Sequence, residues 1–116
     1  MFTDIEDFLK ELISLQHELL SGYRIDIVYK RIDKISLRIP IISTLFIDIY
    51  ANTDTKRYDF SLIKDNKRIF GYDNLGGWHY HPLNKPDNHI KCKKPSLRHI
   101  LKEITVAINS LEKDST

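Results

Sequence analysis

The chain has 116 residues, of which 41% are hydrophobic and 29% charged, and its formal net charge is +2. This length predicts a single domain over residues 1–116 with one small core. So weak a net charge gives no sign by itself of a nucleic-acid-binding protein. The one cysteine, Cys92, excludes an intrachain disulfide framework and fits a reducing compartment. The sequence shows neither a signal peptide nor an apolar run of about 18–20 residues, so we expect a cytoplasmic protein without membrane contact.

The first predicted element is an amphipathic helix over residues 4–20. Thr3 and Glu6 have the spacing of a capping box, in which side chains bind the free N–H groups of the first turn. Apolar residues then recur at helical spacing, and Ser21-Gly22 forms a stop signal. His17 lies off the apolar stripe, so we expect it to be structural or exposed.

From Tyr23 onward the hydrophobic period changes to two, which predicts four or five antiparallel strands. The expected strands cover residues 23–30, 35–41, 45–51, 58–62 and 67–73. Pro40 cannot donate a hydrogen bond to a sheet ladder, so its strand should end there or lie at an edge, where a homodimer could form. Asp65-Asn66 predicts a tight hairpin because both residues tolerate positive φ.

A long loop is predicted over residues 74–94, which are rich in Gly, Pro, Asn and His. Loops of this length in compact domains are usually functional or disordered. Pro95-Ser96 predicts the start of a C-terminal helix with Ser96 as its N-cap, and residues 113–116 should fray. The fold class is therefore α+β: an N-terminal helix, an antiparallel sheet of four to five strands, a His-rich loop and a C-terminal helix packed on the sheet.

The candidate chemistry lies in a group of histidines within the last third of the chain. His79 and His81 are two residues apart, so on an extended segment both point to one side and Tyr80 points to the other. His89 follows in the same predicted loop. The nearby cations are Lys85, Lys91, Lys93, Lys94 and Arg98. Histidine can transfer a proton near neutral pH, and cations can hold a phosphate. Metal-independent RNA cleavage needs this combination, because the substrate's own 2′-hydroxyl is the nucleophile.

Three interpretations of this cluster stay open on the residues alone. The first is a ribonuclease-like site that uses His79, His81 and His89. The second is zinc binding, which Asp73 or Cys92 could complete, although no standard zinc spacing is present. The third is a polar loop whose histidines cap backbone groups or face solvent. Cys92 has no defined base beside it and is not expected to be a nucleophile.

The run Arg68 to Asn74, the histidine segment that follows it and the Pro95-Ser96-Leu97 helix start resemble the TumE family. These are small toxins of bacterial and archaeal toxin–antitoxin pairs. The specific part of the resemblance covers residues 68–101, and the length and the preceding antiparallel strands also fit. Many members carry adjacent histidines, whereas here Tyr80 separates the pair.

The resemblance implies a toxin of a type II system that a small protein antitoxin neutralises. Its implied action is RNA cleavage, or RNA binding that blocks translation, with no metal or other cofactor. The implied catalytic residues are His79, His81, His89 and Asp73, and the implied substrate-binding residues are Lys85, Lys91, Tyr72 and Trp78. The alternative from another class is a non-enzymatic module whose loop binds a protein or a nucleic acid through its aromatic residues. A zinc-stabilised loop is a weaker alternative.

Overall fold

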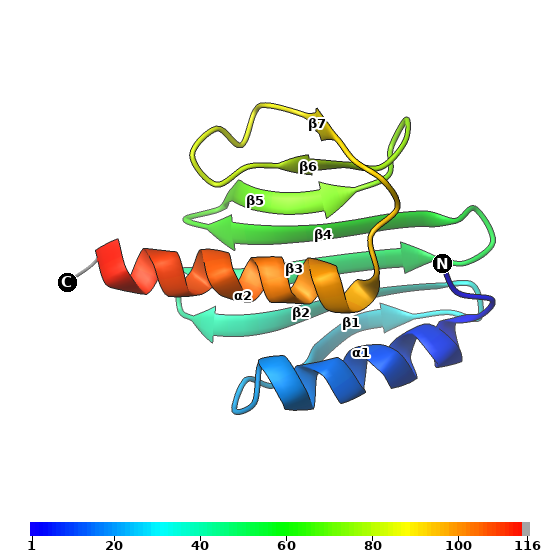
Figure 1. Ribbon diagram of the computed structural model, residues 1–116. Helices are drawn as coiled ribbons and strands as arrows, with labels where there is room; N and C mark the ends of the chain where they lie inside the picture. Colours follow the sequence, from blue (N-terminus) through cyan, green and yellow to red (C-terminus); the bar gives the residue numbers. More distant parts are fainter. Residues whose placement is uncertain (115–116) are drawn as a thin grey trace.

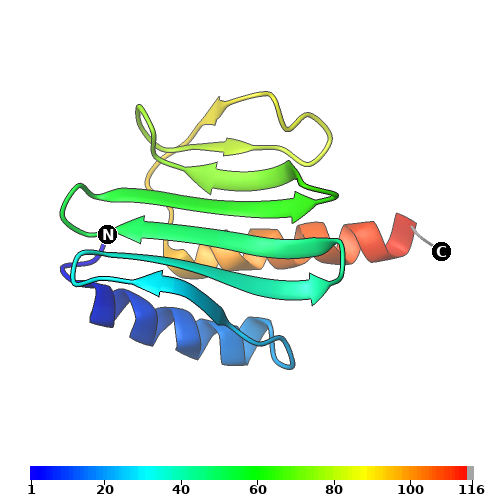
Figure 2. The same ribbon diagram turned by 180° about the vertical axis from the view of Figure 1, so that it is seen from behind.

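The computed structural model describes residues 1–114 and consists of one antiparallel sheet with two helices packed on one of its faces (Figure 1, Figure 2). The elements in chain order are α1 (Ile5–Leu19), β1 (Asp26–Lys30), β2 (Lys34–Ile42), β3 (Leu45–Asn52), β4 (Arg57–Lys64), β5 (Lys67–Asp73), β6 (His79–His81), β7 (Ile90–Lys91) and α2 (Leu97–Asp114). The predicted α+β class is confirmed. Of the residues predicted to fray, 113 and 114 belong to α2, whereas 115–116 lie outside the described residues.

The sheet is a meander in which the strands lie in the order β1 to β7, so each strand pairs with its neighbours in sequence. The predicted four to five strands are wrong, because the sheet has seven. The two additional strands, β6 and β7, lie within residues 74–94, which we predicted to be a loop. They have three and two residues, too few to display a period of two in the sequence.

Pro40 lies inside β2 rather than at its end, since this strand continues to Ile42. Proline has no N–H to donate to a neighbouring strand, and Pro40 does lie at a local edge of the sheet. β1 pairs with β2 only along residues 35–38, so Pro40 faces no ladder partner on the β1 side. The first strand begins at Asp26 and not at Tyr23 as predicted. Because β1 is the outermost strand, Ile27 is half exposed rather than buried.

The N-cap of α1 differs from the prediction, whereas that of α2 confirms it. Asp4, not Thr3, is the N-cap of α1, because the Asp4 carboxylate accepts a hydrogen bond from the Asp7 N–H at 2.8 Å. The Thr3 hydroxyl instead donates to the Asp7 side chain. Ser96 caps α2 as predicted, and its hydroxyl accepts from the His99 N–H at 3.0 Å. Within residues 1–114, neither helix combines the length and the apolar character that a membrane span requires.

The core lies between the helices and the sheet face that they cover. Alternate residues of β2 to β5 point into it, namely Ile35, Leu37, Ile39, Ile47, Ile49, Phe60, Leu62, Phe70 and Tyr72. The predicted hairpin between β4 and β5 is confirmed, with φ of 50° at Asp65 and 67° at Asn66. The opposite sheet face carries no helix among the described residues (Figure 2). β5 contacts α2, whereas β6 and β7 extend past this helix on the covered side (Figure 1).

Candidate functional site

A polar cluster lies on the helix-free face of β4, β5 and β6. Side chains alternate along a strand, so the positions between the core residues point to this face. The pairing register sets Asp59 opposite Asp73, and Asp73 opposite His79. Three neighbouring strands therefore present one side chain each at the same level of the sheet. We use the name polar cluster for Arg57, Asp59, Ser61, Arg68, Asp73, His79, His81 and His89.

Asp73 is the centre of the polar cluster and is only 4% exposed. Its Oδ1 atom lies 3.3 Å from His79 Nε2, and its Oδ2 atom lies 3.0 Å from His81 Nε2. Burial raises the pKa of this carboxyl, but the Leu75 N–H, the His81 hydrogen bond and the charges of His79 and Arg57 outweigh burial. The pKa of Asp73 therefore lies below its ordinary value, and its ionised carboxylate accepts a hydrogen bond from the Nε2 atom of each imidazole when that atom carries a proton.

Backbone carbonyl groups fix the orientation of the same two rings. The Gly77 carbonyl lies 2.9 Å from His79 Nδ1, and the Pro86 carbonyl lies 3.0 Å from His81 Nδ1. A carbonyl oxygen can only accept a hydrogen bond, so both Nδ1 atoms carry a proton. Nε2 is consequently the atom that gains or loses a proton in each ring.

His81 is hydrogen bonded in both of its protonation states. Arg68 Nη1 lies 2.9 Å from His81 Nε2, and Asp73 Oδ2 lies 3.0 Å from the same atom. The neutral ring accepts from Arg68, whereas the protonated ring donates to Asp73. Arg68 is itself held by Ser61, whose hydroxyl accepts from its Nε at 3.0 Å, and by the Asp59 carboxylate. A general acid–base group needs this ability to exist in either state.

His89 completes a group of three imidazoles. Its ring centroid lies 4.9 Å from that of His79 and 4.5 Å from that of His81. One nitrogen atom from each of the three rings lies within 4.8 Å of the other two, so the three rings could also hold a transition metal such as zinc. His89 is exposed, unlike the other two. Cys92, a possible zinc ligand on the sequence, is not part of this group, and burial raises the pKa of its thiol.

The two predicted aromatic contacts lie on the other side of the sheet. Tyr72 points to the helix-covered face, where its hydroxyl lies 3.4 Å from His99 Nε2. Trp78 stacks on the core residue Tyr58 with 6.3 Å between the ring centroids. Neither side chain therefore belongs to the polar cluster.

The two predicted lysines lie at the margin of the site. Lys85 is exposed in the turn between β6 and β7. Lys91 is exposed on β7 and lines a shallow pocket at the sheet edge together with His79 and His89. Of the two, Lys91 is thus the one that shares a pocket with the histidines.

Two arginines and Asp59 belong to the site and were missed in the sequence. Arg57 Nη2 lies 3.9 Å from Asp73 Oδ1 and 3.5 Å from Asp59 Oδ2, and Arg68 Nη1 lies 3.6 Å from Asp73 Oδ2. Both guanidinium groups therefore contact the buried carboxylate of Asp73, and Arg68 also contacts His81. The sequence did contain a sign of two of the three missed residues. Arg57 and Asp59 alternate with core residues of β4, so their side chains share a face with that of Asp73.

Comparison with known proteins agrees with the motif-based resemblance. A family model described as toxin TumE matches residues 4–108, which run from the start of α1 into α2 and include the whole sheet. No curated protein and no solved structure matches the chain. The matched segment contains every residue of the polar cluster and far exceeds half of the chain. This protein belongs to the TumE family of toxins.

Proposed function

We propose that this toxin acts in the cytoplasm as a metal-independent ribonuclease and forms a type II pair with a small protein antitoxin. The observation that carries the proposal is the position of His81 Nε2 between a donor, Arg68, and an acceptor, Asp73. A second histidine, His79, contacts the same carboxylate, which supports the proposal because the reaction requires one acid and one base.

In the proposed reaction the ribose 2′-hydroxyl attacks the adjacent phosphorus. A 2′,3′-cyclic phosphate forms as the bond to the 5′-oxygen of the next nucleotide breaks. One of His79 and His81 removes the 2′-hydroxyl proton, and the other gives a proton to the leaving 5′-oxygen. Arg68 and Arg57 stabilise the negative charge that grows on the phosphate. His89 is the third imidazole of the site, and because it is exposed, an entering RNA strand can contact it.

The test is RNA cleavage by the purified protein in excess chelator, with His81→Ala as the site variant and His17→Ala as the matched control. His17 is exposed on α1, away from the polar cluster. Loss of one acid–base group should lower the cleavage rate by about 10²–10⁴-fold in His81→Ala and leave His17→Ala unchanged. Cooperative thermal unfolding of both variants shows that they are folded.

Two results would contradict the proposal. Full cleavage by folded His81→Ala would remove this residue from the reaction. Loss of wild-type cleavage in chelator alone would favour a metal ion held by the three imidazoles.

A second candidate function is a non-enzymatic module that blocks translation or binds a protein partner. The aromatic side chains on the helix-covered face of β5 and β6 favour it, because they are not all covered by α2. Such a module should tolerate His81→Ala and His79→Gln and lose growth inhibition in Trp78→Ala. A catalyst should show the reverse order. Co-purification with the product of a neighbouring reading frame tests the antitoxin partner, and the possible homodimer stays a prediction.

A further inference from the structure

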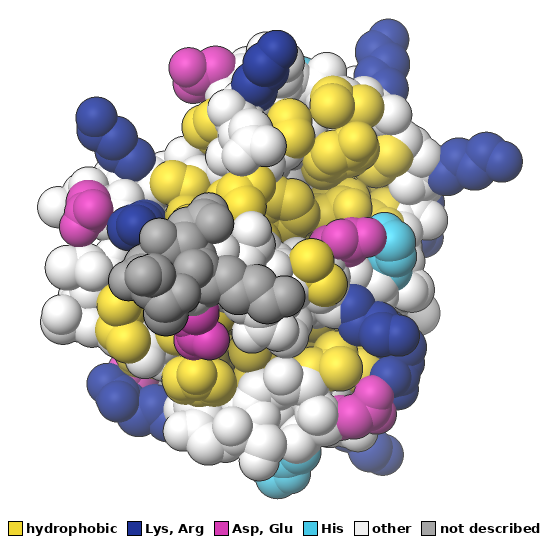
Figure 3. Space-filling model, turned by 60° about the vertical axis from the view of Figure 1, so that its left-hand side comes forward, with side chains coloured by type: hydrophobic (Ala, Val, Ile, Leu, Met, Phe, Trp, Pro, Cys, Tyr) yellow, Lys and Arg dark blue, Asp and Glu magenta, His cyan; other side chains and the backbone are white. Residues whose placement is uncertain are grey.

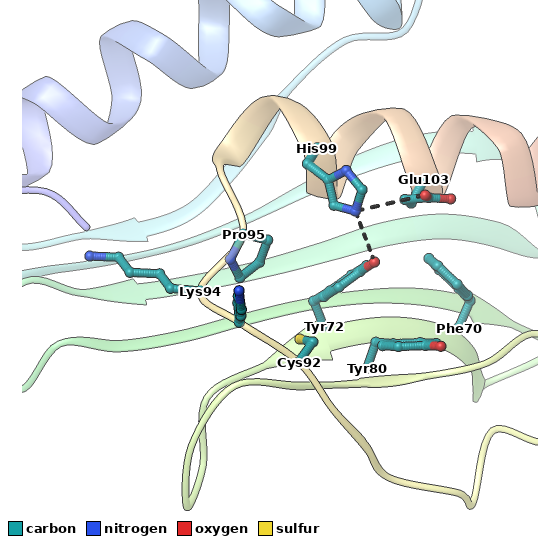
Figure 4. A pocket seen from close by; sticks show the side chains of 9 residues that line it. Phe70, Tyr72, Tyr80, Cys92, Lys94, Pro95, His99 and Glu103 are labelled. Atoms are coloured by element: carbon teal, nitrogen blue, oxygen red, sulfur yellow. Dashed lines mark hydrogen bonds and ion pairs between the residues drawn. The ribbon is translucent and has the colours of Figure 1, made fainter.

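We infer that the helix-covered side of β5 and β6 holds a second RNA subsite, a pocket that stacks one unpaired base of the strand whose phosphate lies in the polar cluster. This inference rests on the proposed function. The pocket has a volume of about 510 Å³, and its lining includes Phe70, Tyr72, Tyr80, Lys93, His99 and Glu103 (Figure 4). We call it the base pocket.

The base pocket exists because the sheet is wider than its helix layer. α2 contacts β5, whereas β6 and β7 continue beyond this helix (Figure 1). The segment 92–96 crosses from β7 to the start of α2 and closes one end of the gap (Figure 1). Seen from the side where α2 ends, an apolar area remains open on the β5–β7 side of this helix (Figure 3).

Aromatic rings form one wall of the base pocket. The ring centroids of Tyr72 and Tyr80 lie 5.5 Å apart with a 34° tilt, and Phe70 meets Tyr72 edge to face at 6.0 Å. Tyr72 is buried, whereas Tyr80 is only partly covered. Tyr80 therefore has ring surface available to a ligand. Stacking of a base on such a ring contributes about 1–3 kcal/mol and tolerates any base.

Polar atoms form the opposite wall, on the first turns of α2. The Tyr72 hydroxyl lies 3.4 Å from His99 Nε2, which lies 3.7 Å from a Glu103 carboxylate oxygen (Figure 4). Burial, followed by the Glu103 charge, raises the pKa of Tyr72 to about 12, so its hydroxyl stays protonated. A carboxylate accepts hydrogen bonds from exocyclic amino groups, so this wall favours cytosine, adenine or guanine over uracil, which has no such group.

The base pocket adjoins a second pocket at the edge of the sheet. Cys92 lines both the base pocket and the edge pocket that contains His79 and His89. The exposed Lys91 and Lys93 flank Cys92 on either side in the sequence. A polyanionic strand that passes from the polar cluster around β7 would meet these two cations before its base enters the pocket. This charge favours RNA over an apolar peptide as the occupant.

The test uses a short fluorescent RNA oligonucleotide with 2′-O-methyl groups throughout, which binds but cannot be cleaved, and measures anisotropy. Tyr80→Ala should weaken binding about tenfold, and Tyr80→Phe should bind as the wild type does. Tyr29→Ala on β1, at the other edge of the sheet, is the matched control and should have no effect. Lys93→Ala should reduce the slope of log affinity against log salt by about one.

Base preference gives a second readout of the same pocket. Oligocytidylate should bind more tightly than oligouridylate, and Glu103→Ala should abolish the difference.

The outcomes separate this inference from the proposed function. Wild-type affinity and cleavage in folded Tyr80→Ala would overturn the base pocket and leave the ribonuclease proposal standing. Normal RNA binding with loss of antitoxin binding in this variant would assign the pocket to a protein partner instead. A wild-type protein that neither binds nor cleaves RNA would overturn both.

Discussion

The two faces of β4 and β5 are built from alternate residues of the same strands, yet they are buried in different ways. Phe60 and Tyr72 on the covered face are buried by helices, which remove apolar surface from water. Asp73 and Ser61 on the other face are 4% and 5% exposed without a helix above them. Their cover consists of neighbouring histidine and arginine side chains, and hydrogen bonds offset the cost of burying them. One face therefore contributes most of the stability of the fold, and the other carries the residues of the proposed chemistry.

The largest effect on stability should come from the covered face. Phe60→Ala removes a fully buried ring from the core, so we expect the free energy of unfolding to fall by about 3–5 kcal/mol in urea titrations. Ser61→Ala, one position along β4, is the matched variant of the other face and should cost about 1 kcal/mol. Equal losses in the two variants would contradict the separation of the faces.

A substitution at Gly71 should affect both stability and the proposed chemistry, because Gly71 pairs with Ser61 on one side and with His81 on the other. A Cβ atom at this position would lie 2.5 Å from the Phe60 carbonyl oxygen, which is backbone and cannot turn away. Gly71→Ala should therefore push β4 from β5, lower the free energy of unfolding by about 1–3 kcal/mol and reduce cleavage. Wild-type stability of this variant would show that the strands can separate without cost.

The smallest of the three effects should come from the helix-free face. Asp73→Asn keeps an acceptor for the Leu75 N–H but loses the charge, and should cost about 1 kcal/mol at neutral pH. Because the pKa of Asp73 is depressed in the folded protein, its ionised form stabilises the wild type fully above the ordinary value of 3.8. That stabilisation disappears as the pH falls through the lower, folded pKa.

Unfolding measured across acid pH checks this sign. The stabilities of wild type and Asp73→Asn should converge at the acid end, whereas the exposed Asp54→Asn should follow the wild type throughout. If the difference in free energy of unfolding between wild type and Asp73→Asn stayed constant with pH, Asp73 would act through its shape and not through its charge.

The two helices and the longer strands could be predicted because each is long enough to show a repeating pattern of apolar residues. β5 was predicted with the bounds Lys67–Asp73 that the structure has, and the C-terminal helix follows Ser96 as expected. The same-side placement of His79 and His81 is also confirmed, because alternation along a strand fixes it without knowledge of the partner strands.

The rest of the site depends on relations between strands, which a single sequence does not display. Arg68 reaches His81 because the register of β4 and β5 shifts by a bulge near Leu62. His89 returns to the other histidines only through the conformation of the turn after Pro82. Arg57 was identifiable from alternation, but its contact with Asp73 required the pairing of two strands.

The shortness of β7 has a consequence for the native-state ensemble. Its ladder with β6 consists of the pairs His79 with Lys91 and Tyr80 with Ile90, and both of its residues are exposed. Opening such a terminal ladder requires far less free energy than global unfolding, because little apolar surface is released. Amide exchange should therefore be faster at Ile90 than in β4. Because His89 directly precedes β7, each such opening should move His89 away from the cluster, whereas Asp73 should keep its contacts with His79 and His81. We therefore expect the site to alternate between a three-histidine and a two-histidine form.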